Sequence, residues 1–251
     1  MTSFLIYFEL EIIFIIFSSV FLGALIKGAV GIGMSMFSVP IIAFFLPPTT
    51  SMILLCVPIL VTNILQIQIQ KGISSLRFFP MFIALVVGII IGCNLVMKID
   101  MATISKIIAV SIILAAFINL IGFNFYKIEL GLERKITIPL GFFSGIIGGF
   151  SNMYSPYILA YLVSTNLNKE SLIRTIATMY FLGSLFIFPL WFYNGLGTIY
   201  DLIWSSFLLI PAIVGQNIGT RIRHKMSNEF FKRMILYILM IIGLMLLIKN
   251  I

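Results

Sequence analysis

The chain has 251 residues, of which 61% are apolar and 10% are charged, and its mean hydropathy is +1.18. A soluble domain contains about 45–50% apolar and about 25% charged residues, and a soluble surface could not cover this much apolar material. The composition therefore excludes a soluble enzyme or binding protein and predicts an all-α polytopic membrane protein.

Apolar stretches that can form membrane helices follow one another along the whole chain. A spanning helix needs about 20 residues. Ten stretches can be marked, at residues 5–26, 34–46, 50–70, 78–97, 102–121, 136–150, 153–165, 172–193, 199–219 and 229–249. We expect a first membrane repeat at 1–123, a cytoplasmic linker at 124–135 and a second membrane repeat at 136–251.

The net charge of +8 predicts membrane topology rather than nucleic-acid binding. If every stretch reverses the chain, 13 of the 16 basic residues fall on one side, and only Lys98, Lys106 and Lys249 fall on the other. Basic loops stay in the cytoplasm, so both termini of this multi-pass protein are predicted outside the plasma (inner) membrane. Treating 5–46 and 136–165 as single broken spans makes the split far less uneven, which favours a hairpin at each break.

Glycines interrupt two apolar stretches at corresponding places. The run GALIKGAVGIGMSMFSVP (23–40) is echoed by PLGFFSGIIGGFSNMYSP (139–156), with Gly28 aligned on Gly145. Later, GIIIGCNLVMKI (88–99) is similar to PAIVGQNIGTRI (211–222), which pairs Gly92 with Gly215 and Asn94 with Asn217. Since each half holds five stretches, we predict two inverted-topology repeats of about five helical segments each, with a glycine-broken helical hairpin opening each repeat.

The stretches after the two breaks, 34–46 and 153–165, are too short to span a bilayer. About 13 residues of helix extend roughly 20 Å, whereas the hydrocarbon core measures about 30 Å. The N-terminus of such a half-helix has free N–H groups and a partial positive charge. Two of these ends facing one another predict a site for a small anion.

Lys27 is the strongest candidate for an anion contact, because it places a full positive charge beside the first break. It could equally end the apolar run and extend to the cytoplasmic interface, and Arg174 has the same two interpretations. The polar amides within the stretches either line the path or join helices; they are Asn63, Gln66, Asn94, Gln216 and Asn217. The predicted substrate-binding residues are Lys27, Gly28, Gly31, Gly33, Asn94, Gly148, Gly149, Asn152, Arg174 and Asn217.

Two alternative functions remain open at this point. A passive anion channel would use the same site without a coupling ion, and flux after the driving gradient has collapsed separates the two mechanisms. A thiol-redox membrane protein would use the two cysteines, Cys56 and Cys93, although no CxxC motif is present. The sequence contains no metal-ligand cluster and no phosphate-binding loop, so we expect no enzyme activity and no cofactor. The expected partners are a small anion and the lipid bilayer, and homo-oligomer formation is left open.

The run GALIKGAVGIGMSMFSVPIIAFFLPPTTSMILLCVPILVTNILQ (23–66) resembles the first repeat of the TauE/SafE sulfite exporter family. The shared pattern is G-x-x-x-K-G-x-x-G-x-G, followed by a proline, a further proline turn and an Asn-bearing helix. GFFSGIIGGFSNMYSPYILAYL (141–162) is similar to the second repeat of the family. The resemblance extends over essentially the whole chain and implies an export or uptake permease for sulfite or an organosulfonate.

Overall fold

The computed structural model is all-helical over the part of the chain that it describes. That part comprises residues 10–67, 76–95, 98–100, 103, 130–152, 154, 158–159, 161–162, 165, 167–227, 230, 233–234, 237 and 240–241. The first half contains α2 (Leu10–Val30), α3 (Met34–Ile42), α4 (Pro48–Ile53), α5 (Cys56–Ile67), the 3-10 turn η2 (Leu76–Phe78) and α6 (Phe79–Leu95). The second half contains α8 (Leu130–Ser151), α10 (Lys169–Tyr193), α11 (Ile199–Phe207) and α12 (Leu209–Lys225).

Local sequence explains where several helices begin. The Asn168 side chain accepts a hydrogen bond from Ser171 N and thereby caps α10. Thr198 and Asp201 form a reciprocal capping box at the start of α11. At α4, Pro47 precedes the helix and Pro48 occupies its first position, where a missing N–H costs nothing.

Several of the described helices are long and apolar enough to cross a membrane. They are Leu10–Val30, the continuous stretch Thr49–Ile67 and Lys169–Tyr193. The helices α11 and α12 meet at a 41° bend and together form another candidate span. This agrees with the class predicted from composition.

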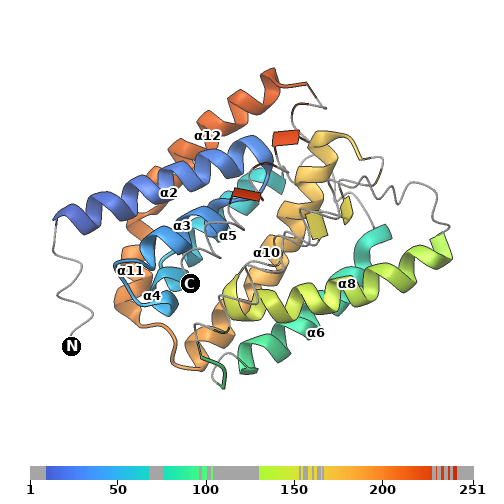
Figure 1. Cartoon of the computed structure of the whole chain (residues 1–251), viewed down its shortest axis with the longest axis horizontal. Coiled ribbons are helices and arrows are strands. Elements are labelled where there is room, and N and C mark those ends of the chain that lie inside the picture. Colours follow the sequence, from blue (N-terminus) through green and yellow to red (C-terminus); the bar gives the residue numbers. More distant parts are fainter. Residues whose placement is uncertain are drawn as a thin grey trace.

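Two tightly packed helix pairs flank the centre of the molecule (Figure 1). One pair is α2 with α12, and the other is α6 with α8. Between them, α10 packs against both α5 and α6. The chain therefore brings the opening helix of each half against a late helix of the other half.

Several predicted boundaries need correction, and α12 ends at Lys225, six residues beyond the predicted end at 219. α2 continues four residues beyond the predicted end at 26, so Lys27 lies in its last turn rather than in a connection. α3 ends at Ile42 instead of residue 46. α8 begins at Leu130, inside the range predicted as a linker. The stretches predicted at 102–121 and 229–249, and most of 153–165, lie outside the described residues.

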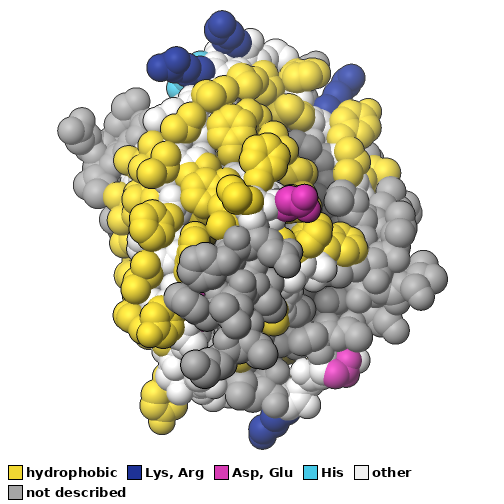
Figure 2. All heavy atoms as spheres, turned by 90° about the vertical axis from the view of Figure 1, so that its left-hand side faces the viewer, with side chains coloured by type: hydrophobic (Ala, Val, Ile, Leu, Met, Phe, Trp, Pro, Cys, Tyr) yellow, Lys and Arg dark blue, Asp and Glu magenta, His cyan; other side chains and the backbone are white. Residues whose placement is uncertain are grey.

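Large apolar side chains lie exposed on the outside of the described helices. They include Phe14 on α2, Phe143 on α8 and Ile210 on α12. In the face drawn in Figure 2, hydrophobic side chains form a broad area, and Lys and Arg side chains lie above and below it. Such a distribution is unfavourable in water and suits a lipid-facing surface between two aqueous interfaces.

Candidate anion site

The first glycine break separates α2 from α3 by three residues. Gly31 has φ +93° and Gly33 has φ +123°, backbone conformations that L side chains rarely adopt. These glycines allow the chain to leave α2 and start α3 at Met34 without a side-chain cap. The first N–H groups of α3 therefore lack intrahelical partners, and they lie next to the last turn of α2.

α3 folds back along α2 and forms a hairpin with it. Ser38 Oγ donates a hydrogen bond to Ser19 O over 2.9 Å. The close approach depends on Gly23, because a Cβ there would lie 2.4 Å from Ser38 Oγ and 3.0 Å from Met34 O. The hairpin holds the N-terminus of α3 inside the molecule, beside Lys27.

Lys27 is buried, with only 4% of its surface exposed, so its ammonium group does not extend to an interface. Its Nζ donates to Thr62 Oγ1 over 2.9 Å and to Asn63 Oδ1. Both partners are uncharged, and none of the ion pairs among the described residues includes Lys27. A buried cation without an opposite charge is unfavourable, and a bound anion would supply that charge.

A second unsatisfied group lies beside Lys27. Asn63 is 1% exposed, and its Nδ2 is buried without a hydrogen-bond partner. Buried polar groups in native structures usually have partners, so an exception of this kind calls for an explanation. An amide N–H donor next to an ammonium group fits an anion.

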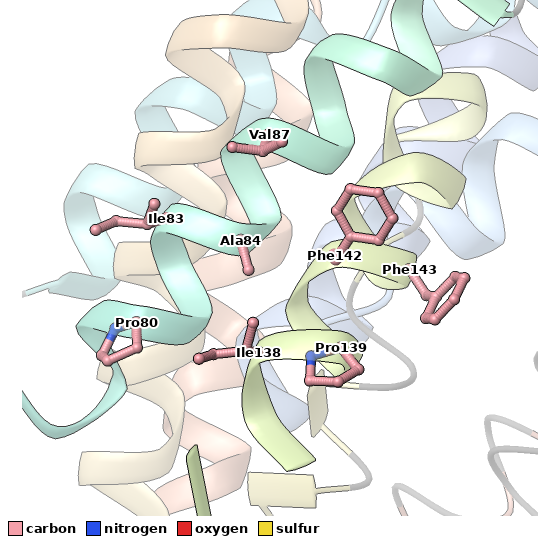
Figure 3. A pocket seen from close by; sticks show the side chains of 8 residues that line it. All are labelled: Pro80, Ile83, Ala84, Val87, Ile138, Pro139, Phe142 and Phe143. Atoms are coloured by element: carbon pink, nitrogen blue, oxygen red, sulfur yellow. The ribbon is translucent and has the colours of Figure 1, made fainter. Parts of the chain in front are cut away.

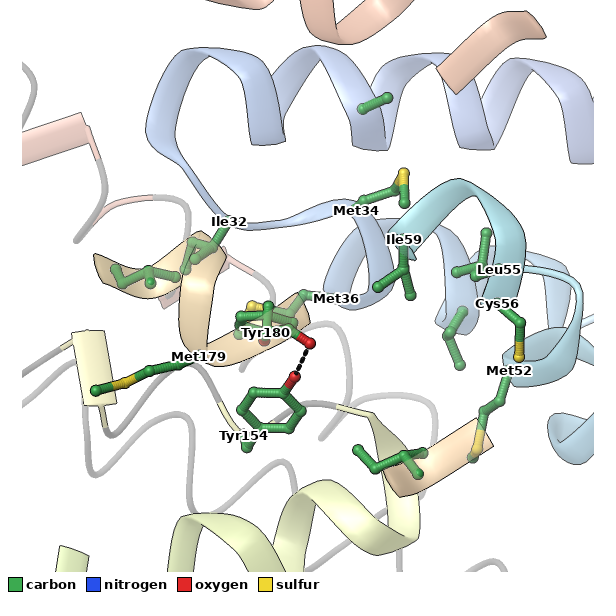
Figure 4. Close-up of a cluster of buried hydrophobic side chains, with 14 of the residues drawn as sticks. Ile32, Met34, Met36, Met52, Leu55, Cys56, Ile59, Tyr154, Met179 and Tyr180 are labelled. Carbon is green, nitrogen blue, oxygen red and sulfur yellow. Dashed lines mark hydrogen bonds between the residues drawn. The ribbon is translucent and has the colours of Figure 1, made fainter. Parts of the chain in front are cut away.

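Lys27 and Asn63 line a small cavity at the start of α3. Its other lining residues are Gly31, Ile32, Gly33, Met34, Ser35, Met36, Ile59 and Tyr180. Figure 4 shows Met36, Ile59 and Tyr180 around this part of the interior. The cavity volume is about 10 Å³, close to the minimum for one water molecule. A sulfite ion is larger, so the cavity must widen before it can accept one.

Hydrogen bonds from neighbouring helices fix the end of α2 that carries Lys27. Gln66 Nε2 on α5 donates to Lys27 O over 3.0 Å, and Arg223 Nη1 on α12 donates to Gly28 O over 2.7 Å. Gln216 Nε2 donates to Thr62 O over 3.0 Å and so links α12 to α5. The first two bonds reach carbonyls in the last turn of α2, where Lys27 O also accepts a hydrogen bond from Gly31 N over 2.7 Å.

The second glycine break is the end of α8, and it differs chemically from the first. Asn152 has φ 57° and is fully buried, and both its Nδ2 and its Oδ1 lack hydrogen-bond partners. Gly149 O accepts a hydrogen bond from Trp191 Nε1 over 2.9 Å. A Cβ at Gly148 would lie 2.4 Å from the Tyr154 ring, which stacks on Tyr180 with centroids 4.1 Å apart. Gly148 makes room for the Tyr154 ring and Gly149 for the backbone of α6, where a Cβ would lie 2.6 Å from Cys93 N. Neither glycine lines the cavity described above.

Besides Gly148, Gly149 and Asn152, four more predicted site residues do not line the cavity. Gly28 is at the crossing of α2 and α12. Asn94 and Asn217 occupy exposed faces of α6 and α12, and Asn94 Nδ2 bonds Ile90 O within its own helix. Arg174 is half-buried in the first turns of α10 and does not line the cavity. The buried residues at these places are Cys93 and Gln216. Each directly precedes the asparagine that the sequence alignment had selected.

A larger groove lies between α6 and α8, but it is apolar throughout. Its volume is about 590 Å³, and Figure 3 shows its lining, which includes Ile83, Val87, Ile138 and Phe142. No charged residue contributes to it. Such a surface does not compensate the charge of an anion, so the smaller cavity at Lys27 is the better candidate.

An ion pair between exposed Arg77 and buried Glu133 joins η2 to the start of α8. Arg77 Nη2 lies 2.8 Å from Glu133 Oε1, and Tyr161 OH also donates to this carboxylate. The hydrogen bond to Glu133 raises the pKa of Arg77. The pair connects the two halves of the chain at a point away from the Lys27 cavity.

The family described as Sulfite exporter TauE/SafE matches residues 15–246 of the 251-residue chain. The chain belongs to the TauE/SafE sulfite exporter family. No match was found among curated proteins or among solved structures. The TauE/SafE match starts within α2 and extends beyond α12, so it includes both glycine breaks and the Lys27 cavity. TauE/SafE proteins are transporters, and the apolar helices and exposed apolar surface agree with a membrane transport protein.

Proposed function

We propose that this chain is a secondary transporter of a small anion, sulfite or an organosulfonate, and that it works by alternating access. The observation that carries the proposal is the environment of Lys27. A buried ammonium group, a buried amide donor without a partner and the N-terminus of α3 meet at one cavity. All three attract an anion, and family membership supports a sulfur oxyanion as the cargo.

The proposed site keeps Lys27, Gly31, Gly33 and Asn152 from the predicted set and adds Asn63. Lys27 Nζ supplies charge, Asn63 Nδ2 donates a hydrogen bond, and the two glycines expose the N-terminus of α3. Asn152 contributes from the second break, because its buried amide has unused hydrogen-bonding capacity. Gly28, Gly148 and Gly149 allow close packing in this proposal, and no role in binding is assigned to Asn94, Arg174 or Asn217.

Glycine packing supports two inverted repeats that rock around the site. A Cβ at Gly28 would lie 2.2 Å from Gln216 O, and one at Gly145, its aligned partner, would lie 2.1 Å from Leu85 O. The other aligned glycines lie at the same two crossings, since a Cβ at Gly92 would meet Ile146 O and a Cβ at Gly215 would meet Phe21 O. The opening helix of each proposed repeat therefore crosses a helix of the other through aligned glycines, as a two-fold relation requires.

Flux measurements in proteoliposomes test the proposal. We expect saturable uptake of sulfite or sulfoacetate that is accelerated by the same anion on the opposite side, because a carrier returns faster when loaded. Chloride should be carried poorly, since it offers no arrangement of oxygens to the donors. The absence of saturable flux for every sulfur oxyanion would contradict the proposal.

The same assay separates the carrier from a passive anion channel. After all ion gradients have been collapsed, a carrier still exchanges labelled for unlabelled anion, one for one. A channel instead lets label equilibrate without dependence on unlabelled anion inside the vesicles. A rate of label uptake that does not depend on unlabelled anion inside the vesicles would favour the channel.

Replacing both cysteines tests the redox alternative. Cys56 and Cys93 are free and buried on α5 and α6, and Cys93 Sγ lies 3.7 Å from Gly149 O. Buried free cysteine commonly acts as a small apolar residue. A Cys56→Ala/Cys93→Ala variant should therefore keep most of its anion flux at unchanged expression. Loss of flux with a normally folded variant would favour thiol chemistry.

A further inference from the structure

We infer that the apolar wall of the Lys27 cavity selects anions with three oxygens on sulfur and rejects those with four. The wall consists of Ile32, Met34, Met36 and Ile59, which are each 2–3% exposed. On this basis the site takes sulfite or a sulfonate and excludes sulfate. The inference rests on the proposed function, because it concerns the same cavity.

The hydrogen-bond donors of the cavity come from a limited set of groups. Among the lining residues, the groups that can donate are Lys27 Nζ, Asn63 Nδ2, the hydroxyls of Ser35 and Tyr180, and the N–H groups at the start of α3. Tyr180 completes the lining with an aromatic ring that is stacked on Tyr154 (Figure 4). The remaining lining side chains, those of Ile32, Met34, Met36 and Ile59, are aliphatic chains and thioethers, which donate no hydrogen bond.

Sulfite and sulfate make a matched pair for such a surface. At alkaline pH, where sulfite is fully deprotonated, both are dianions, and they differ at one corner of the sulfur, where sulfite has a lone pair and sulfate has a fourth oxygen. A sulfonate has a carbon substituent at that corner. A charged oxygen placed against Met34, Met36 or Ile59 loses its hydration without gaining a donor, which is unfavourable. A lone pair or a methyl group at this corner loses much less hydration than a charged oxygen does. The polarizable thioethers of the methionines pack well against it.

The expected discrimination is large enough to measure. An apolar pocket discriminates against one added hydroxyl by about 100-fold, and a charged oxygen is more strongly hydrated than a hydroxyl. We therefore expect sulfate to compete with labelled sulfite at least about 100-fold less effectively than unlabelled sulfite does. Methanesulfonate, which keeps three oxygens, should compete far better than sulfate.

Met36→Gln is the most informative variant, with Met36→Leu as its matched control. Glutamine has nearly the same length and volume as methionine but adds an amide donor, whereas leucine keeps the wall apolar. In proteoliposomes, Met36→Gln should improve competition by sulfate relative to sulfite by about 10-fold, the value of one hydrogen bond to a charged group. Met36→Leu should leave the ratio unchanged. Met34→Gln makes the same change at a second wall position and serves if Met36→Gln does not fold.

The outcomes of these experiments distinguish a failure of the selectivity inference from a failure of the proposed function. Transport of sulfite with equal competition by sulfate in the unmodified protein would overturn the selectivity inference and leave the proposed function standing. The same holds if both glutamine variants fold, carry sulfite and keep the original ratio. If the unmodified protein neither transports sulfite nor shows competition by methanesulfonate, the proposed function itself fails.

Discussion

Lys27→Met is expected to reduce sulfite flux at least about 30-fold, which corresponds to the lower end, about 2 kcal/mol, of the cost of removing one member of a buried charge pair. Methionine keeps the length of the side chain and removes the charge that would bind the anion. The partners Thr62 and Asn63 are uncharged, so the substitution leaves no opposite charge unpaired. The measurement is the initial rate of labelled sulfite uptake in proteoliposomes with matched protein content.

The stability of the same variant should not fall. Removing a buried cation that no described acid pairs with eliminates a desolvation penalty, so the melting temperature in detergent should stay the same or rise. Arg221→Gln removes an exposed positive charge on α12 and serves as the matched control, with flux expected near that of the unmodified protein. Full sulfite flux in a stable Lys27→Met protein would show that the lysine only joins α2 to α5.

Gly145→Ala is expected to destabilise the protein by about 1–3 kcal/mol, the usual cost of overpacking. The added Cβ would lie 2.1 Å from Leu85 O and 3.0 Å from the Cα of Gly88. Both contacts are with backbone, so α6 and α8 must move apart over a whole crossing. We expect a melting temperature in detergent that is lower by roughly 5 °C, together with a smaller yield of monodisperse protein.

Gly197→Ala provides the comparison for this substitution. A Cβ at Gly197 would meet only side-chain carbons, at 3.1 Å, and side chains adjust more easily than helix backbones. Its melting temperature should stay within about 2 °C of the unmodified protein. Equal effects at the two positions would show that the helix crossing tolerates an extra methyl group, against the packing argument.

Much of the helical framework could be predicted because it depends on apolar length and on glycine. The stretches at 78–97 and 172–193 correspond closely to α6 and α10, since each is bounded by turn residues or by a cap. The end of α2 could not be placed, because Gly28 and Lys27 weaken the apolar pattern, while packing against α12 and α5 keeps the helix intact through Val30. Tertiary contacts thus overrode local propensity at that point.

The sequence predicted the position of the site, but it did not predict which residues contact Lys27. The sequence placed Lys27, Gly31 and Gly33 at a helix break, and the structure brings all three to one cavity. Asn63 was one of several span amides that were indistinguishable by pattern, and only its contact with Lys27 sets it apart. Asn94 and Asn217 were selected from the repeat alignment. That alignment fixes the register between the halves but not which face of a helix is buried.

The hydrogen bonds at the end of α2 have a consequence for how cargo leaves. Two successive carbonyls, Lys27 O and Gly28 O, are held by side chains from α5 and α12. The backbone that carries the Lys27 side chain is thereby held by two neighbouring helices, α5 and α12, which limits how far the side chain can move. We expect the Lys27 ammonium group to stay in place during transport. Release of the bound anion then requires the facing surface of α3 and α10 to move away from it.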